Sequence, residues 1–396
     1  MTDTELAILL EAGTQQFIRE HASDDPYALA LQAKRFPNIP IQQIAEQIQA
    51  RQKAKKKLPE WSQTEGVIFP PSLAMEQCSS EATATFKSSL VSGTSIVDLT
   101  GGAGIDTYYL SRSFERGTYV EQNPRLATIA QHNFRQLGAS SIEIHATDAE
   151  AFLSSMEAAD LIYLDPARRD DAQRKVFRLS DCSPDVTSML PGLLIKGKQV
   201  MLKTSPMLDI DAAMNDLGNV DQVYVVAVNN ECKEVLYLLS SQAVASPKIT
   251  ALDLANGAVP LQFAREGETK ASVPYAEPQR YLYEPHAAIL KAGAFRSVAQ
   301  QYGVAKLHPS THLYTSEQLV ANFPGRTFRI QSVAPYQKKV VRKYVPEGKA
   351  NISTRNFGDS VATVRKKLGL QEGGDAYLFA TATQLQHRVI LITQKI

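Results

Sequence analysis

The feature that most constrains the fold is an alternation of strand-like and helix-like segments between residues 67 and 245. Seven segments rich in β-branched and aromatic residues are predicted as strands: SIVDL (95–99), GTYVEQ (117–122), IEIHATD (142–148), DLIYLD (160–165), KQVMLKTS (198–205), QVYVVAV (222–228) and VLYLLSS (235–241). Helical segments separate the first five strands, whereas only NNECKE separates the last two. We therefore predict an α/β fold whose sheet is mostly parallel, with helices on both faces and an antiparallel edge.

A glycine-rich loop, DLTGGAGID (98–106), follows the first predicted strand. Glycines at this position let a ligand approach the backbone closely. A dinucleotide site would read GxGxxG and direct a helix N-terminus at a pyrophosphate. Here Thr107 stands where the last glycine should be, and Asp106 would repel a phosphate. Asp98 and Asp106 instead favour a cationic ligand that carries an amino group.

Acidic residues also end the next two predicted strands. Glu121 in TYVEQN can accept two hydrogen bonds from a ribose diol, and Asp148 in IEIHATD can accept one from an adenine amine. The carboxyl ends of parallel strands meet at one edge of the sheet, where open α/β sheets bind their ligands. We therefore expect these acids and the glycine-rich loop to line one site.

In their order and spacing, DLTGGAGID, VEQN, ATDA and LIYLDPAR resemble the motifs of class I S-adenosylmethionine-dependent methyltransferases. The resemblance implies a Rossmann-like sheet and S-adenosyl-L-methionine as the cofactor. It implies that the following residues contact this cofactor: Asp98, Thr100, Gly101, Gly102, Gly104, Asp106, Glu121, Asp148 and Asp165. Asp98 and the glycines would shape the methionine side of the pocket. The alternative for the glycines is an ordinary turn between a strand and a helix.

The fourth predicted strand ends in Asp165 and Pro166. Methyltransferases of this class that act on amino groups of bases carry Asp or Asn, two prolines and an aromatic residue here. Ala167 and Arg168 depart from that motif. Asp165 would accept a hydrogen bond from an exocyclic amine and direct the nitrogen lone pair at the methyl group. We therefore predict Asp165, Pro166 and Arg168 as catalytic residues.

Positive charge gathers after this strand. Arg168 and Arg169 are predicted to bind the substrate, by stacking on a base or by holding a phosphate. Lys203, at the end of the fifth strand, is predicted to face the same cleft. The alternative is that the arginines pair with Asp170 and Asp171 in a solvated loop.

The three cysteines, Cys78, Cys182 and Cys232, lie far apart and form no CxxC pair. This pattern predicts neither a disulfide framework nor a metal site. Methyltransferases that attack a pyrimidine carbon need a cysteine nucleophile after the fifth strand, where this chain has MLKTSPMLD. We therefore rank transfer to carbon below transfer to nitrogen or oxygen.

Residues 1–66 are predicted to form an N-terminal helical region, because apolar residues recur at three- and four-residue spacing. The basic run RQKAKKK (51–57) is interpreted as a solvated helix end or, alternatively, as a nucleic-acid contact. The first residues are acidic and amphipathic, unlike a signal peptide, and no uncharged apolar stretch reaches the roughly 18 residues of a membrane span. We therefore expect a cytoplasmic protein that does not contact a membrane.

The C-terminal part is strongly basic, although the whole chain has a net charge of only +1. Residues 321–396 contain 13 Lys or Arg and 4 Asp or Glu, a net of +9. Here SVATVRKKLGL has helical spacing, and GGDAYLFATA and RVILITQK are typical of a closing strand pair. Together with YLYEPHAAILKAGAF (281–295), these segments resemble the THUMP-like methyltransferases of bacteria.

This second resemblance implies a C-terminal α+β region after the methyltransferase domain (67–245). It would comprise a linker and ferredoxin-like domain (246–324), loop-rich over residues 246–280, and a basic THUMP-like domain (325–396). Similarity to THUMP domains implies RNA binding, and basic residues interleaved with aromatic ones suit phosphates and unstacked bases. The predicted RNA contacts are Lys338, Lys339, Arg342, Lys343, Arg355 and Lys366. The alternative is a solvated basic surface that binds nothing specific.

Taken together, these patterns predict a methyltransferase that acts on a base of structured RNA, tRNA or rRNA, with transfer to nitrogen preferred. Two alternatives stay open. The protein is a methyltransferase acting on a protein or a small molecule, or it is a non-catalytic S-adenosylmethionine-binding, RNA-binding protein.

Overall fold

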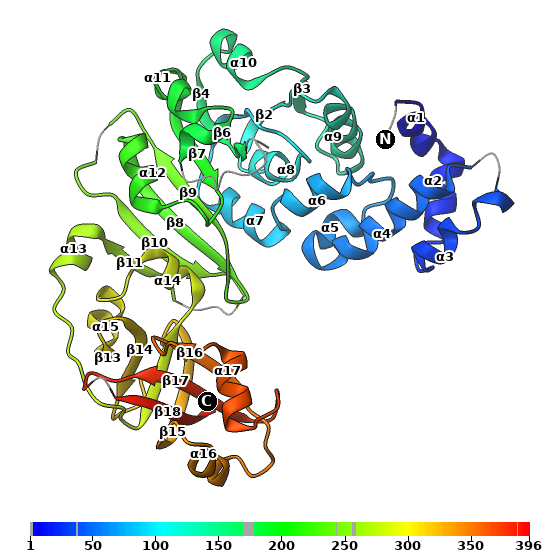
Figure 1. Ribbon diagram of the computed structural model, residues 1–396. Helices are drawn as coiled ribbons and strands as arrows, with labels where there is room; N and C mark the ends of the chain where they lie inside the picture. The colour runs from blue at the N-terminus through cyan, green and yellow to red at the C-terminus, as the bar shows by residue number, and fades with distance from the viewer. Residues whose placement is uncertain (1–2, 37–38, 169–177, 243, 256–258, 386) are drawn as a thin grey trace. The chain divides into compact units, whose positions relative to one another are not determined.

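The computed structural model describes residues 3–36, 39–168, 178–242, 244–255, 259–385 and 387–396 (Figure 1). The contacts between residues divide the chain into two compact units. Unit 1 comprises Met1–Thr204, Asp211–Val220 and Tyr237–Ala243, and unit 2 comprises Ser205–Ile210, Asp221–Leu236 and Val244–Ile396.

The N-terminal region is helical, as predicted. Its helices are α1 (Asp3–Leu10), α2 (Ala12–Glu20), α3 (Pro26–Ala30), α4 (Ile41–Lys57) and α5 (Pro59–Gln63). Two residues of the basic run have structural roles in this region. Arg51 donates hydrogen bonds to the carbonyls of Ser62, Thr64 and Val67. Lys57 donates to the carbonyls of Met75 and Glu76.

One nine-stranded sheet has the order β11-β10-β8-β9-β7-β4-β1-β2-β3. Its strands are β1 (Gly93–Asp98), β2 (Phe114–Val120), β3 (Ile142–His145), β4 (Ala159–Leu164), β7 (Gly197–Thr204), β8 (Val220–Val228), β9 (Glu231–Leu239), β10 (Lys248–Asp253) and β11 (Leu261–Ala264). The connecting helices of this part are α6 (Ser72–Gln77), α7 (Glu81–Ser89), α8 (Ile105–Ser111), α9 (Pro124–Gln136), α10 (Ala149–Ser155), α11 (Val186–Lys196) and α12 (Ile210–Leu217). The strands β7, β4, β1, β2 and β3 pair in parallel, which confirms the predicted α/β sheet.

The predicted hairpin at the end of this pattern is also present. Strands β8 and β9 are separated by Asn229 and Asn230 alone, whose φ angles are 54° and 62°. Two asparagines in the left-handed region are typical of the type I′ turn that joins adjacent antiparallel strands.

The segment predicted as a loop-rich linker contains regular structure. Within residues 246–280, β10 pairs in parallel with β8, β11 pairs antiparallel with β10, and α13 (Arg265–Lys270) follows. The prediction gave too much weight to Gly and Pro in the turns and too little to the short alternation in KITALD and LQFA.

The C-terminal part of unit 2 is built on one seven-stranded sheet of order β13-β14-β12-β15-β18-β17-β16. Its strands are β12 (Tyr281–Pro285), β13 (Ala305–His308), β14 (Thr311–Ser316), β15 (Gly325–Pro335), β16 (Asn351–Arg355), β17 (Ala376–Ala382) and β18 (Arg388–Lys395). Its helices are α14 (Ala287–Ala292), α15 (Ser297–Tyr302), α16 (Lys338–Tyr344) and α17 (Val361–Leu368). The predicted helix and closing strand pair correspond to α17 and to the antiparallel strands β17 and β18.

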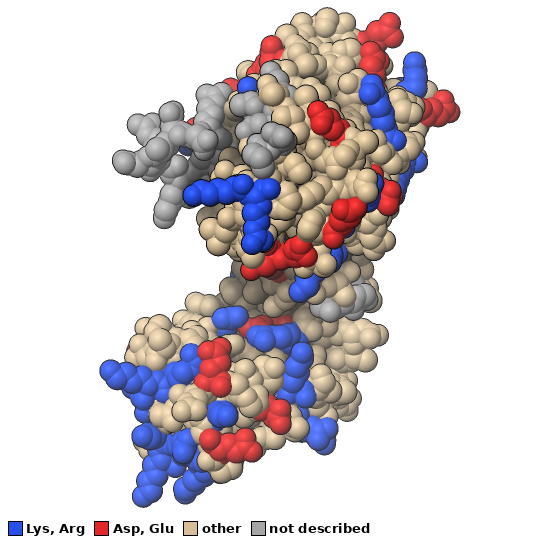
Figure 2. All heavy atoms as spheres, turned by 90° about the vertical axis from the view of Figure 1, so that its right-hand side faces the viewer, with Lys and Arg blue, Asp and Glu red and all other residues tan. Residues whose placement is uncertain are grey.

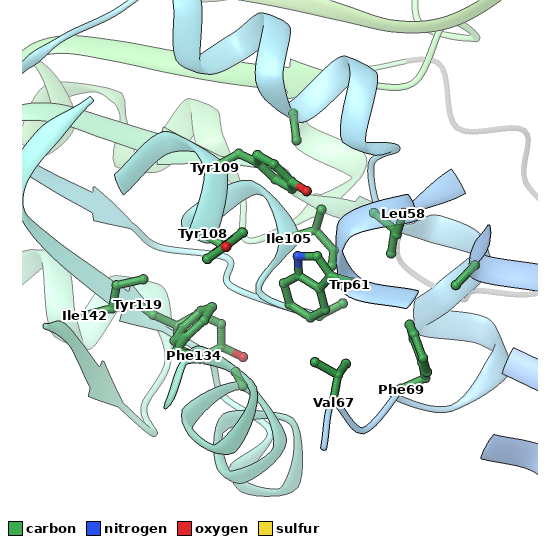
Figure 3. Packing of buried hydrophobic residues seen from close by; sticks show 14 of the residues in the cluster. Leu58, Trp61, Val67, Phe69, Ile105, Tyr108, Tyr109, Tyr119, Phe134 and Ile142 are labelled. Atoms are coloured by element: carbon green, nitrogen blue, oxygen red, sulfur yellow. The ribbon is translucent and has the colours of Figure 1, made fainter. Parts of the chain in front are cut away.

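Apolar side chains hold the helical region against the glycine-rich loop in unit 1 (Figure 3). Trp61 is fully buried, and its ring meets that of Tyr108 edge-on with centroids 5.7 Å apart. Tyr119 and Phe134 make a similar edge contact at 5.7 Å beside the loop. Because aromatic side chains bury large areas, this cluster fixes α8 and the loop that precedes it.

Candidate active site

The glycine-rich loop runs from the end of β1 to the start of α8. A Cβ atom built on Gly101 would lie 2.2 Å from the ring of Tyr119, so only glycine fits there without displacing a buried side chain. Gly104 precedes α8 with φ of 79°, a left-handed conformation that glycine adopts without strain. These two positions require glycine for reasons of shape, whatever the loop binds.

Asp98 is the last residue of β1 and is only 1% exposed. Its Oδ1 accepts a hydrogen bond from the backbone N–H of Thr100 at 2.9 Å, and its Oδ2 accepts one from the Thr107 hydroxyl at 2.5 Å. Burial raises the pKa of Asp98 to about 7. A nearby cation would favour the ionised carboxylate, so this residue fits the ammonium group of a ligand.

Glu121 follows β2, and its side chain binds the backbone of the glycine-rich loop. Its Oε2 accepts a hydrogen bond from the N–H of Gly102, and its Oε1 accepts one from the N–H of Asn123, both at 2.8 Å. A carboxylate has about four acceptor sites, so two hydroxyl groups can still bind. The four residues that follow Glu121 in the sequence line a hollow of about 570 Å³: Gln122, Asn123, Pro124 and Arg125.

Asp148 lies at the start of α10 and is exposed. Its Oδ1 accepts a hydrogen bond from the N–H of Ala151 at 2.8 Å, so it caps the helix. The sequence pattern suggested an adenine contact and did not suggest this structural role.

Asp165 directly follows β4, and its backbone N–H donates to the Thr100 hydroxyl at 2.6 Å. The Thr100 hydroxyl in turn donates a long hydrogen bond of 3.4 Å to Asp98. Burial raises the pKa of the Asp165 carboxyl, while the ammonium group of Lys203 acts in the opposite direction. The structure therefore brings Asp98, Thr100 and Asp165 together at the carboxyl ends of neighbouring strands.

Asp106 and two lysines complete a buried charged cluster. Lys203 forms ion pairs with Asp165 and, at 3.6 Å, with Asp106, while the fully buried Lys87 lies 3.2 Å from Asp106. Ser79 and Tyr163 donate hydrogen bonds of 2.7 Å to Oδ2 of Asp106. Burial alone would raise the pKa of Asp106, but Lys87 and Lys203 hold it well below its usual value.

Sequence reasoning missed the role of Lys87. The only sequence signal is its position three residues after Ala84, which places a lysine on the buried face of α7. Ser80 caps this helix and forms a capping box with Thr83. Ser79 instead contacts Asp106.

Three further predicted residues follow Asp165 along the chain. Pro166 is half-buried, and Arg168 ends the two-residue strand β5 (Ala167–Arg168), which pairs with β6 (Cys182–Ser183). Arg169 lies outside the described residues.

The predicted RNA contacts in unit 2 fall into two groups. Arg355 binds Glu284, a buried residue that also pairs with Arg326, so Arg355 takes part in a structural ion cluster. The others lie on α16 and α17, whose Val341 and Val364 share one apolar cluster. Lys338, Lys339, Lys343 and Lys366 are exposed there and Arg342 is half-buried.

One lysine of α16 lies against the end of α17. A Cβ built on Gly369, which ends α17, would lie 2.7 Å from the side chain of Lys338 on α16. Lys338 is therefore placed at a helix C-terminus, which favours a positive charge by itself. Figure 2 shows Lys and Arg side chains gathered on the surface of unit 2.

Family models match three parts of this chain. Residues 281–324 match a ferredoxin-like domain, residues 325–395 match a THUMP domain-like model, and residues 81–183 match a model described as conserved hypothetical protein 95. An uncharacterized S-adenosylmethionine-dependent methyltransferase of Mycobacterium tuberculosis H37Rv is 22% identical over 301 residues, 75% of this chain and 80% of the relative.

A crystal structure from Porphyromonas gingivalis W83, described there as a candidate methyltransferase, is similar over the whole chain. The identity is 34%, the TM-score is 0.88, and the match covers 99% of this chain and 98% of the other. The chain therefore belongs to the S-adenosylmethionine-dependent methyltransferases that carry ferredoxin-like and THUMP-like domains.

The predicted family, the Rossmann-like fold and the cofactor S-adenosyl-L-methionine are thereby confirmed. The individual contacts to the cofactor stay predictions, and the buried carboxylate of Asp98 is the feature that fits its ammonium group best. Over the part of the chain that the structure describes, no helix has both the length and the apolar character to span a membrane.

Proposed function

We propose that the protein transfers a methyl group from S-adenosylmethionine to a nitrogen atom of a base in structured RNA, either tRNA or rRNA. The observation that carries the choice of RNA is the lysine-rich surface on α16 and α17 of the THUMP-like part. Residues 321–396 have a net charge of +9, which suits a polyanionic partner. We include in this proposal domain boundaries after residues 66, 245 and 324.

Within the active site, each acid has a proposed contact. Asp98 binds the cofactor's ammonium group, Glu121 binds the ribose hydroxyls, and Asp148 accepts a hydrogen bond from the adenine amine. When bound, the cofactor supplies an electrophilic methyl group. Asp165 accepts a hydrogen bond from an N–H of the acceptor base and so orients the nitrogen lone pair towards the methyl group. Its contribution to catalysis is the positioning and electrostatic stabilisation of the acceptor.

The cysteines support nitrogen as the acceptor in preference to carbon. Burial raises the pKa of Cys232 to about 11 and also raises that of Cys78. A thiol in this state is protonated at neutral pH and is a poor nucleophile. Cys182 is buried, at 3% exposure.

The test is transfer of labelled methyl from S-adenosylmethionine to separate RNA, DNA, protein and metabolite fractions from cells that lack this protein. We expect label in RNA, and much less label with the variant Asp98→Asn at the same concentration of S-adenosylmethionine. Label only in protein or metabolites would refute the proposal, and so would the absence of label from every fraction when the cofactor binds normally.

The role of the basic surface is tested by the double variant Lys339→Glu/Lys343→Glu, because both side chains are exposed on α16. RNA binding is expected to weaken, and the slope of log K against log salt to fall by about 2, one for each lost phosphate contact. The control Lys248→Glu/Lys270→Glu makes the same charge change at exposed sites outside α16 and α17. Equal weakening by both variants would contradict a specific role for α16.

A further inference from the structure

Lys203 is buried at the active site, with its side chain only 9% exposed. Its ammonium group forms ion pairs with Oδ2 of Asp165 and Oδ2 of Asp106. A lysine is rarely buried unless its charge is paired, and here two carboxylates satisfy that condition. This leaves little of the ammonium group accessible to a substrate.

We propose that Lys203 is a positioning residue for methyl transfer: its ammonium group fixes the Asp165 carboxylate through Oδ2, so that Oδ1 is presented to the N–H of the acceptor. The inference rests on the proposed function, because it takes Asp165 as the group that contacts the acceptor. It gives Lys203 an indirect role in place of the substrate contact predicted from the sequence.

The register of the sheet places these two residues together. Strands β4 and β7 pair in parallel, with Tyr163 opposite Met201 and Leu164 opposite Leu202. Asp165 follows Leu164 and Lys203 follows Leu202, so the two residues come next along the two paired strands. Neighbouring strands of a sheet lie about 4.8 Å apart. The ion pair is therefore set by two central strands of the sheet rather than by a flexible loop.

Asp165 is held at two separate points. Its backbone N–H donates to Thr100, and its carboxylate binds Lys203. Lys203 is held in turn by Asp106, whose other oxygen faces the fully buried Lys87. Two carboxylates and two ammonium groups balance, which limits the cost of burying them.

Removal of the Lys203 charge would upset this balance. Within the described part of the chain, the charged groups that act on Asp165 are then Asp106 on α8, Lys87 on α7 and Asp98 on β1. Two of these three are carboxylates, and both disfavour ionisation of Asp165. Asp165 would therefore keep its proton to a higher pH and would no longer be an acceptor-only group.

The direct experiment is a carbon-13 NMR titration of the protein labelled at aspartate carboxyl carbons, with Asp165→Asn used to assign the Asp165 resonance. In Lys203→Met the titration midpoint of Asp165 is expected to rise by at least one pH unit, and in Lys203→Arg to return towards wild type. An unchanged midpoint in Lys203→Met would overturn the inference. Lys203→Gln, which keeps an N–H donor without the charge, replaces Lys203→Met if the latter does not fold.

The control is Lys198→Met on the same strand, because Lys198 is 81% exposed and pairs with Asp160. It is expected to leave the Asp165 midpoint unchanged. This titration needs no substrate, so its outcome is independent of whether RNA is the acceptor.

The kinetic arm uses methyl transfer to bulk RNA from cells that lack this protein. Lys203→Met is expected to lower kcat more than tenfold at pH 7, with the KM for S-adenosylmethionine within twofold of wild type. The loss should shrink as pH rises and Asp165 ionises. A loss of kcat that is equally large at every pH would indicate that Lys203 has only a structural role, and it would overturn the inference. Failure of the wild-type protein to label RNA would instead refute the proposed function.

Discussion

Lowering the pH from 7 to 5 is expected to weaken binding of S-adenosylmethionine, because Asp98 becomes protonated. Asp98 is 1% exposed and accepts hydrogen bonds from Thr100 and Thr107, neither of which carries a charge. Burial is the main cause that raises its pKa to about 7. The hydrogen bonds from Thr107 and Thr100 act against burial, while the neighbouring Asp106 and Asp165 act in the same direction as burial. The ammonium group of the cofactor would pair with the carboxylate and gain little from the neutral acid.

The size of the effect follows from that pKa. With a pKa of about 7, Asp98 is about half ionised at pH 7 and about 1% ionised at pH 5. If only the carboxylate binds the cofactor, the Kd rises about 50-fold, which corresponds to about 2.3 kcal/mol. An α-amino group has a pKa near 8, so the cofactor's own charge changes little over this range.

The assay is isothermal titration calorimetry of S-adenosylmethionine binding at pH 5, 6 and 7. Asp98→Asn is expected to bind weakly with little pH dependence, whereas Asp165→Asn should keep most of the wild-type pH dependence. Binding below pH 7 should also release a proton, which calorimetry in buffers of different ionisation enthalpy measures. A wild-type Kd constant within threefold, or the same slope in Asp98→Asn, would refute the reasoning.

Two further substitutions test the loop and the C-terminal sheet. Gly101→Ala places a Cβ 2.2 Å from the buried Tyr119 ring, so cofactor affinity measured by calorimetry should fall at least tenfold. The control Gly267→Ala, whose Cβ meets open space, should leave the cofactor affinity unchanged. Glu284→Gln leaves Arg326 and Arg355 without their shared carboxylate, so urea unfolding should show a loss on the order of 3 kcal/mol. Glu266→Gln, in an exposed pair, should cost less than about 1 kcal/mol, and equal losses would contradict the assigned role of Glu284.

The strands and the acids at their ends were predictable because both signals are local. Asp98, Glu121 and Asp165 each stand where an apolar run ends, and the parallel sheet brings such ends to one edge. Asn229 and Asn230 carry a turn preference within two residues. In all these cases the residues that decide the structure are neighbours in sequence.

The partners of the acids were not predictable by the same means. Lys87 and Asp106 are 19 positions apart, and Lys203 and Asp165 are 38 apart, so each pairing depends on how elements pack. Arg355 was predicted to contact RNA because it lies in a basic segment, but its bond to Glu284 joins residues 71 positions apart. Composition predicts which region of the chain is charged, but the partner of each charged side chain depends on the tertiary structure.

Among the residues that the structure describes, one acid at this site has no ion partner of its own. Asp106 and Asp165 are balanced by Lys87 and Lys203, whereas the hydrogen bonds that Asp98 receives from described residues come from neutral groups. Because its pKa rises on folding, Asp98 makes the protein without cofactor less stable as the pH rises from about 4 to 7. If Asp98 binds the ammonium group of S-adenosylmethionine as proposed, that cation would reverse the effect, and the free energy lost at Asp98 in the empty protein would be recovered as affinity for the cofactor.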